Sequence, residues 1–224
     1  KANVMSNYFF IKTRTIHFVV VVTIIAAALG VIADLCLLLY AYRNNPQLPF
    51  LSGMPASILA AGSVLGMVAI FIYMMGSAAL VFYAFRRSFA GKIYVIFSTF
   101  TMAVAMVAHT KMATMISVCV ESGSIEIFSP CSLEGPGAPA HFVLFLLLGS
   151  LAMSAVFSLA IINRGTVFPR FMAVLNPAVL MLLLTLICLN FGLYAEAFVF
   201  AVPSITVFIY TLLLDYVMQF DLQA

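Results

Sequence analysis

The chain has 224 residues, of which 65% are hydrophobic and only 8% are charged. Because soluble domains carry about 25% charged residues, this composition excludes a soluble globular protein and predicts an integral membrane protein. The formal net charge of +3 is too small to indicate a nucleic-acid partner, so we expect the lipid bilayer to be the main partner of the chain.

Six apolar runs follow one another along the chain, and a spanning helix needs about 20 such residues. They lie at residues 16–42, 57–85, 92–119, 141–162, 169–190 and 193–218. Proline and glycine occur in most of the segments between them, as is typical of loops. The sequence therefore predicts a single all-α domain over residues 1–224, a polytopic membrane helical bundle with about six transmembrane helices.

The first run follows Lys12 and Arg14, as the apolar region of a signal peptide would. It is much longer than the roughly 7–15 residues of such a region, contains Asp34, and lacks a clear cleavage site of small residues. We therefore expect a helix that is retained. The chain starts at Lys1 rather than Met, which leaves open whether the native product starts earlier.

Positively charged residues alternate between the segments that flank the runs. They occur before the first run and in the second and fourth loops (Lys1, Lys12, Arg14; Arg86, Arg87, Lys92; Arg164, Arg170), whereas the first loop has only Arg43 and the third and fifth have none. Since Lys and Arg favour the cytoplasmic side, we expect both termini and the second and fourth loops to be cytoplasmic.

Six polar residues fall in the outer half of the bundle in this topology: Asp34, His109, Lys111, His141, Asn190 and Glu196. Asp34 and Lys111 lie ~12 Å below the outer ends of their helices, and His109 lies ~15 Å below. Ionisable side chains at this depth are costly, so they usually have a partner or a function. We treat the six residues as a candidate ligand-binding or ion-pair cluster and expect Asp34 to lie close to segment 109–111.

Helix geometry places His109 and Lys111 about 200° apart, so both side chains cannot point at Asp34. Either His109 points inward and Lys111 extends outward, or Lys111 pairs with Asp34 or Glu196. The cluster is compatible with a structural ion pair, with substrate or proton handling, and with a catalytic or metal site. Ligand spacings such as HxxxH and HExxH do not occur, and His17 lies at the inner end of its run, so we expect no metal or haem and no cofactor.

Two cysteines, Cys119 and Cys131, flank the acidic third loop. A disulfide is chemically allowed on the outer side of the membrane, and two free thiols are the alternative.

Gly62 and Gly66 form a GxxxG pattern in the second run, which indicates close packing of helices. Pro203 interrupts the sixth run, where it can free a backbone carbonyl or bend the helix.

Three segments carry a resemblance to a known family: "ADLCLLLY" (33–40), the histidine of the third run, and "TVFPRFMAVLNP" (166–177). Together they resemble a family of uncharacterised bacterial multi-pass membrane proteins. That family has an Asp in its first span, a His in its third and an FPRW-M-A-x-x-NP element before its fifth; here Phe171 replaces the Trp. The resemblance implies about six helices in a bacterial inner membrane and implies no activity. It singles out Asp34, His109, Arg170 and Asn176. From the residues themselves, Arg170 lies at the cytoplasmic headgroup level, so we expect Arg170 and Asn176 to form a cytoplasmic anchor, with a lipid-headgroup or regulatory role as the alternative.

Two classes of function remain. The first is a transporter, channel or binding protein whose polar cluster contacts a small or amphipathic ligand, such as a lipid or a small hydrophobic molecule. The second is an intramembrane enzyme that acts on a lipid, with His109 as general base and Asp34 orienting it. No nucleophile motif or ATP-binding loop occurs, which favours the first class. An accessory subunit of a membrane complex, or an oligomer, is also compatible with the sequence.

Overall fold

The computed structural model describes the backbone of residues 2–44, 51–85, 89–121, 140–163, 168–188, 190 and 195–223. Side chains are described for residues 15–44, 51–85, 89–121, 145–163, 168–188, 190 and 201–216. The helices of this part are α1 (Ala2–Ala41), α2 (Ala56–Ala84), α3 (Phe89–Glu121), α5 (Ala140–Ile162), the 3-10 helix η2 (Arg170–Ala173), α6 (Pro177–Cys188) and α7 (Ala195–Gln223). The predicted all-α bundle is confirmed.

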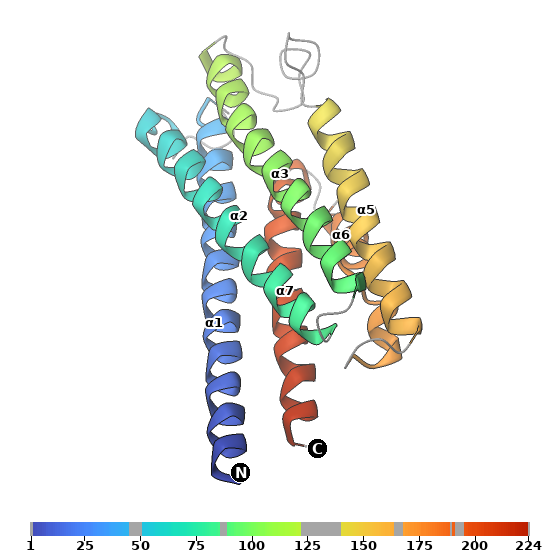
Figure 1. Ribbon diagram of the computed structural model, residues 1–224. Helices are drawn as coiled ribbons and strands as arrows, with labels where there is room; N and C mark the ends of the chain where they lie inside the picture. Colours follow the sequence, from blue (N-terminus) through green and yellow to red (C-terminus); the bar gives the residue numbers. More distant parts are fainter. Residues whose placement is uncertain are drawn as a thin grey trace.

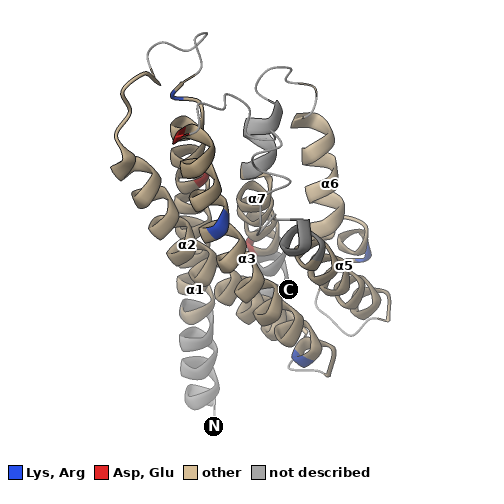
Figure 2. Ribbon diagram, turned by 90° about the horizontal axis from the view of Figure 1, so that it is seen from above, with Lys and Arg blue, Asp and Glu red and all other residues tan. Residues whose placement is uncertain are grey.

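Four helical segments are long and apolar enough to cross a membrane: Thr15–Ala41, Ala56–Ala84, Phe89–Glu121 and Phe145–Ile162. Large apolar side chains on their outer faces are exposed, among them Phe18, Val64 and Ile96. Most of the ribbon carries no charged residue (Figure 2). A bundle that is apolar on the outside as well as inside fits a lipid bilayer, where outward apolar residues face no water.

The helices form one bundle in which each packs against its neighbours along much of its length (Figure 1). α1 packs mainly against α2 and α7, α3 packs against α2 and α5, and α6 packs against α7. The N-terminus and the C-terminus lie at the same end of the bundle (Figure 1), which we call the terminal end; the other end is called the loop end.

Three clusters of buried apolar residues stabilise the bundle. An aromatic cluster near the terminal end joins α3, α5 and α7 with the residues that follow α2 and precede η2, through Tyr94, Phe157, Tyr210, Phe85 and Phe168. A middle cluster is built on small residues of α1 and α2 with Tyr73 and Met102. A third cluster near the loop end contains Leu37, Tyr40, Leu59, Ala113, Ile116 and Val120.

The loop end is closed by polar contacts of the residues that follow α1. Arg43 Nη1 donates a hydrogen bond of 2.9 Å to the hydroxyl of Tyr40, and its guanidinium lies 4.5 Å from the centre of the same ring. Asn44 Nδ2 donates a hydrogen bond of 3.1 Å to the carbonyl of Val120 at the end of α3. The ends of α1 and α3 are therefore tied together above the third cluster.

The predicted first span, 16–42, agrees with the apolar segment Thr15–Ala41, but α1 extends beyond it and begins at Ala2. Residues 2–14 contain no proline or glycine to stop the helix. The fifth run, predicted as one helix over 169–190, is divided into η2 and α6. α6 has 12 residues and is only about 18 Å long, which is shorter than a bilayer core of about 30 Å.

The division of the fifth run lies before Pro177, where the backbone leaves the helical hydrogen-bond pattern. Side chains of α5 satisfy the backbone groups that are released: Ser158 Oγ donates to the carbonyl of Ala173 at 2.8 Å, and Ser154 Oγ accepts from the amide of Ala178 at 3.1 Å. Asn176 Oδ1 accepts from the amide of Val179 at 3.0 Å and so caps α6. The break is therefore hydrogen bonded on both sides.

Candidate functional site

Asp34 of α1 lies where α1, α3 and α7 meet. Its Oδ1 atom is 3.7 Å from Nδ1 of His109 on α3, and its Oδ2 atom accepts a 2.8 Å hydrogen bond from Ser204 Oγ on α7. The side chains of Asp34 and His109 are only 10% and 5% exposed. Three helices thus meet at one buried carboxylate.

The imidazole of His109 is fixed from its other side by α2. Nε2 lies 3.2 Å from the carbonyl oxygen of Gly62. A carbonyl can only accept, so Nε2 carries the hydrogen of this bond. A Cβ added to Gly66 would overlap the ring of His109, so the ring occupies space that only glycine leaves free. The predicted close packing at Gly62 and Gly66 is present, and one partner is the histidine.

The two glycines of α2 face different helices. A Cβ on Gly62 would lie 2.9 Å from Cβ of Cys36 and 3.0 Å from the carbonyl of Ala33, both on α1. Gly66 faces α3 through His109. Because both positions lack a side chain, α1 and α3 can approach α2 closely at this level, and Asp34 of α1 can therefore approach His109 of α3.

Tyr73 completes the site from α2. Its hydroxyl shares a hydrogen bond with Ser204, and it lies close enough to Asp34 for the two groups to interact electrostatically. A Cβ added to Gly30 would be 3.0 Å from Ser204 Oγ and 3.3 Å from the Tyr73 ring, so Gly30 allows α7 to approach α1 here. We call Asp34, Tyr73, His109 and Ser204, with the carbonyl of Gly62, the polar centre.

The polar centre lies between two apolar layers. In α1, Asp34 comes between Ala27 of the middle cluster and Leu37 of the loop-end cluster. In α3, His109 comes between Met102 and Ala113 of the same two clusters. Apolar packing therefore separates the polar centre from both ends of the bundle.

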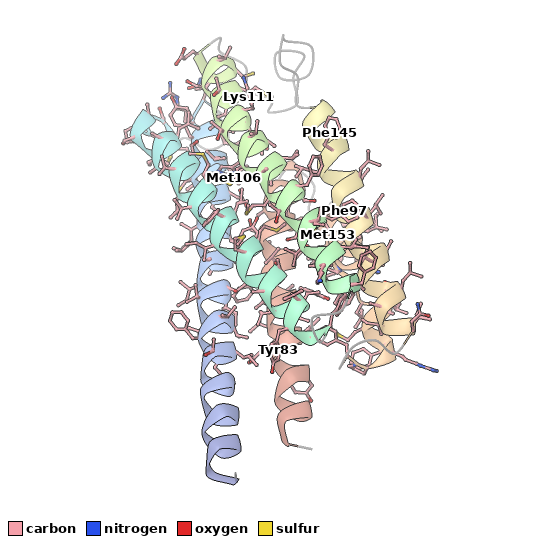
Figure 3. All side chains as sticks on the ribbon, in the orientation of Figure 1. Tyr83, Phe97, Met106, Lys111, Phe145 and Met153 are labelled. Atoms are coloured by element: carbon pink, nitrogen blue, oxygen red, sulfur yellow. The ribbon has the colours of Figure 1, made fainter. Side chains whose placement is uncertain are left out.

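The structure brings together only part of the predicted cluster. Lys111 is exposed and lies toward the loop end of α3, far from Tyr83 at the other end (Figure 3). Among the described side chains, none forms an ion pair with Lys111. His109 therefore points inward and Lys111 outward, which is the first of the two predicted arrangements.

Three further members of the predicted cluster do not add to the polar centre as described. Asn190 is exposed and donates a hydrogen bond of 2.8 Å to the carbonyl of Leu186 in its own segment. The side chains of His141 and Glu196 lie outside the described residues, although their backbones belong to α5 and α7.

The two residues proposed as a cytoplasmic anchor have different surroundings. Arg170 is exposed in η2. Asn176 is half-buried, caps α6, and donates to Ser158 Oγ and to the carbonyl of Ala173, both at 3.1 Å. Asn176 thus joins η2, α5 and α6.

Cys119 is buried in α3, and Cys131 lies outside the described residues, so their disulfide stays a prediction.

A second histidine–aspartate contact joins α1 and α7 toward the terminal end. Nδ1 of His17 is 3.9 Å from Oδ1 of Asp215, and the two side chains are 48% and 23% exposed. The sequence analysis did not identify this pair. It offers a natural comparison with the polar centre, because the same residue types meet in a much more open position.

Sequence reasoning also missed Ser204 and Tyr73. Ser204 follows Pro203, which was the signal available in α7, but a serine in a membrane helix often bonds only to its own backbone. Tyr73 gave no signal beyond its aromatic ring. Among the described residues, no three His, Cys, Asp or Glu side chains are grouped so that they could hold a metal ion.

The sequence and the fold were compared with known proteins. No protein family, curated protein or solved structure matches the chain.

Proposed function

We propose that this chain is a multi-pass protein of a bacterial inner membrane, with both termini cytoplasmic, that binds or transports a small or amphipathic ligand through the polar centre. The polar centre is the working part of this proposal. It consists of the carboxylate of Asp34, the imidazole of His109 and the hydroxyls of Ser204 and Tyr73, contributed by four helices.

The observation that carries the proposal is the burial of the Asp34–His109 contact within apolar layers. A charged residue at the centre of a membrane helix costs ~2.5–3.5 kcal/mol on insertion scales, and such residues usually mark ion or substrate pathways. No Lys or Arg among the described side chains neutralises Asp34, since the ion pairs there involve only histidine. A polar centre without a permanent cation can accept one from a ligand.

Glycine at three of the helix contacts supports a centre that opens. Gly30, Gly62 and Gly66 let α1, α2, α3 and α7 approach one another closely around the polar centre. We infer that these glycine contacts are where the helices separate when a ligand enters. Since the polar centre is nearly closed in this structure, ligand access requires movement of this kind.

The alternative of an intramembrane enzyme is less well supported. Nucleophilic catalysis needs the serine hydroxyl to face the general base, with the acid behind the base. Here Ser204 donates to Asp34 rather than to His109, so the order of the three groups is wrong for activation of the serine. A binding or transport role uses the same groups without that order.

A transport assay with reconstituted protein tests the proposal. Proteoliposomes that contain the wild-type chain would be loaded from outside with a fluorescent amphipathic cation or, separately, with a neutral small solute. We expect uptake of at least one probe above that of empty liposomes. Asp34→Asn should lower uptake at least tenfold while the circular dichroism spectrum and the elution volume stay unchanged.

Asp215→Asn is the matched control, because it removes an aspartate from a histidine contact that also involves α1 but lies outside the polar centre. It should keep uptake within about twofold, which is less than 0.5 kcal/mol. Equal losses for Asp34→Asn and Asp215→Asn, or no uptake and no saturable binding of either probe by the wild type, would contradict the proposal.

A further inference from the structure

We propose that the Asp34–His109 pair is a proton-binding site, and that the proton it holds links α1 to α3. This inference deepens the proposed function by naming the proton as a ligand of the polar centre. It rests on the geometry of the pair and on which atoms can donate or accept.

The hydrogen bonds around the pair fix where the hydrogens can be. Nε2 of His109 donates to the carbonyl of Gly62, so Nδ1 is the atom that faces Asp34. Oδ2 of Asp34 accepts from Ser204, so Oδ1 is the atom that faces His109. Both facing atoms, Nδ1 and Oδ1, are acceptors unless a proton is added to one of them.

One added proton makes the contact attractive, and it can reside on either partner. On Nδ1 it gives an imidazolium beside a carboxylate; on Oδ1 it gives a carboxylic acid that faces a neutral imidazole. When it leaves, the lone pair of Nδ1 faces an anionic oxygen at 3.7 Å and the pair has a net negative charge. That charge is costly between apolar layers. Loss of the proton therefore weakens the contact between α1 and α3.

No other described charged group replaces this proton. Tyr73 faces the pair from α2, and the hydroxyl of Ser204 faces it from α7. The described part of α5 has no titratable side chain, and Lys111 on α3 is exposed. Tyrosine is neutral near pH 7. Asp34 and His109 are therefore the two described groups at this site between which the added proton can be shared.

The proton matters for the fold because α1 and α3 are otherwise joined through α2. Each packs mainly against α2, α1 at Gly62 and α3 at Gly66, which lie one turn apart on the same face of α2. The Asp34–His109 contact joins α1 and α3 directly beside this face. We infer that α1 and α3 are held together when the pair is protonated and are released as the pH rises and the proton leaves.

Spectroscopy of the full chain in lipid nanodiscs tests the site without a transport substrate. The chain has only three histidines, so nitrogen-15 histidine labelling gives few ring resonances, and His109→Gln assigns those of His109. Infrared difference spectra between two pH values report a protonated carboxyl group. We expect Nε2 of His109 to remain protonated. Raising the pH should remove a proton from Nδ1, or remove the carboxylic acid band that Asp34→Asn abolishes.

Two variants should shift the titration in opposite directions. Asp34→Asn removes the carboxylate that favours the proton, so proton affinity at His109 should fall at least tenfold, which is a shift of the midpoint by one pH unit or more to lower pH. Ser204→Ala keeps both titrating groups and removes a hydrogen bond to the carboxylate. The midpoint should therefore move to higher pH. Asp215→Asn is the control and should move only the resonances of His17.

The proposal is overturned by a neutral His109 that carries its hydrogen on Nδ1. It is also overturned if neither the Nδ1 resonance nor a carboxyl band of Asp34 changes with pH while the fold persists, or if Asp215→Asn shifts His109 as much as Asp34→Asn does. Failure here is distinct from failure of the proposed function. Proteoliposomes can transport a probe with a pair that does not titrate, and a titrating pair can occur without transport of either probe.

Discussion

Two buried tyrosines differ in whether their hydroxyl has a hydrogen-bond partner, and comparing them measures what that bond contributes in the polar centre. Tyr73 and Tyr210 are 4% and 3% exposed. The hydroxyl of Tyr73 shares a hydrogen bond with Ser204, whereas that of Tyr210 has no hydrogen-bond partner among the described residues. The same substitution, Tyr→Phe, therefore removes a satisfied hydroxyl at one position and an unsatisfied one at the other.

We expect Tyr73→Phe to lower the free energy of unfolding by about 1 kcal/mol, the typical net contribution of a hydrogen bond. Tyr210→Phe should leave it unchanged or raise it, because a buried hydroxyl without a partner is itself costly. Unfolding in detergent, followed by circular dichroism, measures both. Equal destabilisation by the two variants would contradict the assignment of the hydroxyl partners.

Gly66→Ala tests the fit of His109 against α2. The added methyl group would overlap the imidazole, which must move or push α3 away from α2. Overpacking of this kind costs ~1–3 kcal/mol, and we expect a loss of that size in unfolding free energy. Val68→Ala on the same helix is the control, since Val68 is 50% exposed and should matter little. A fully stable Gly66→Ala variant would argue against the position of the histidine.

Which residues of the polar centre could be predicted depended on charge. Asp34 was predicted to lie close to segment 109–111 from the cost of ionisable groups at similar depth, with either His109 or Lys111 as its partner, and the structure has Asp34 Oδ1 3.7 Å from His109 Nδ1. The direction of Lys111 followed from helix geometry once His109 pointed inward. Ser204 was not predictable, because a hydroxyl adds little cost to a membrane helix and its sequence position, 170 residues from Asp34, contains no information about distance in space.

At the scale of helices, glycine sets the contacts between neighbours. Each of several interfaces pairs a glycine with a polar side chain of the next helix: Gly30 with Ser204, Gly66 with His109, Gly76 with Thr23, and Gly149 with Thr101. The sequence indicated close packing at the GxxxG pattern of α2 and at the small-residue stretch LGSLAMSA that contains Gly149. Gly30 and Gly76 were not identified, and a glycine by itself does not indicate which helix it faces.

Substitutions of Asn176 and Asn190 test which contacts stabilise the division of the fifth run into η2 and α6. Asn176→Ala removes the cap of α6 and the links to Ser158 and Ala173, so unfolding free energy should fall by about 1–2 kcal/mol. Asn190→Ala removes one bond within an exposed segment and should change it by less than about 0.5 kcal/mol. Thermal unfolding of the two variants compares them directly. An Asn176→Ala variant as stable as Asn190→Ala would show that the break is held by other contacts.

The break itself was only partly predictable. The run from 169 to 190 is continuous in hydrophobicity, and Pro177 was the one residue in it that opposed a single helix. Its position after Asn176 gives α6 a capped start. The serines that satisfy the released backbone come from α5, and tertiary contacts of that kind cannot be read from the segment itself.

At the scale of the whole molecule, both termini lie at one end of the bundle, as an even number of crossings requires (Figure 1). Which side of the membrane this end faces rests on the distribution of Lys and Arg. We expect a chain without its native cysteines to show cytoplasmic labelling at Ala90→Cys and Thr166→Cys, and external labelling at Pro46→Cys and Pro130→Cys. A membrane-impermeant maleimide applied to intact cells measures this. External labelling at Ala90→Cys would reverse the orientation.

The contact between Asp34 and Ser204 has a consequence for biosynthesis. Asp34 and Ser204 are separated by 170 positions in the chain. His109 lies in α3, which is also made after α1, so α1 is synthesised before either of its partners. At a synthesis rate of about 5–20 residues per second, Asp34 remains without Ser204 for roughly 10–30 s. During that interval the ribosome and the insertion machinery must shelter an aspartate that lipid does not solvate. A pause or truncation before α7 would therefore leave Asp34 without the hydroxyl that donates to it in the folded bundle.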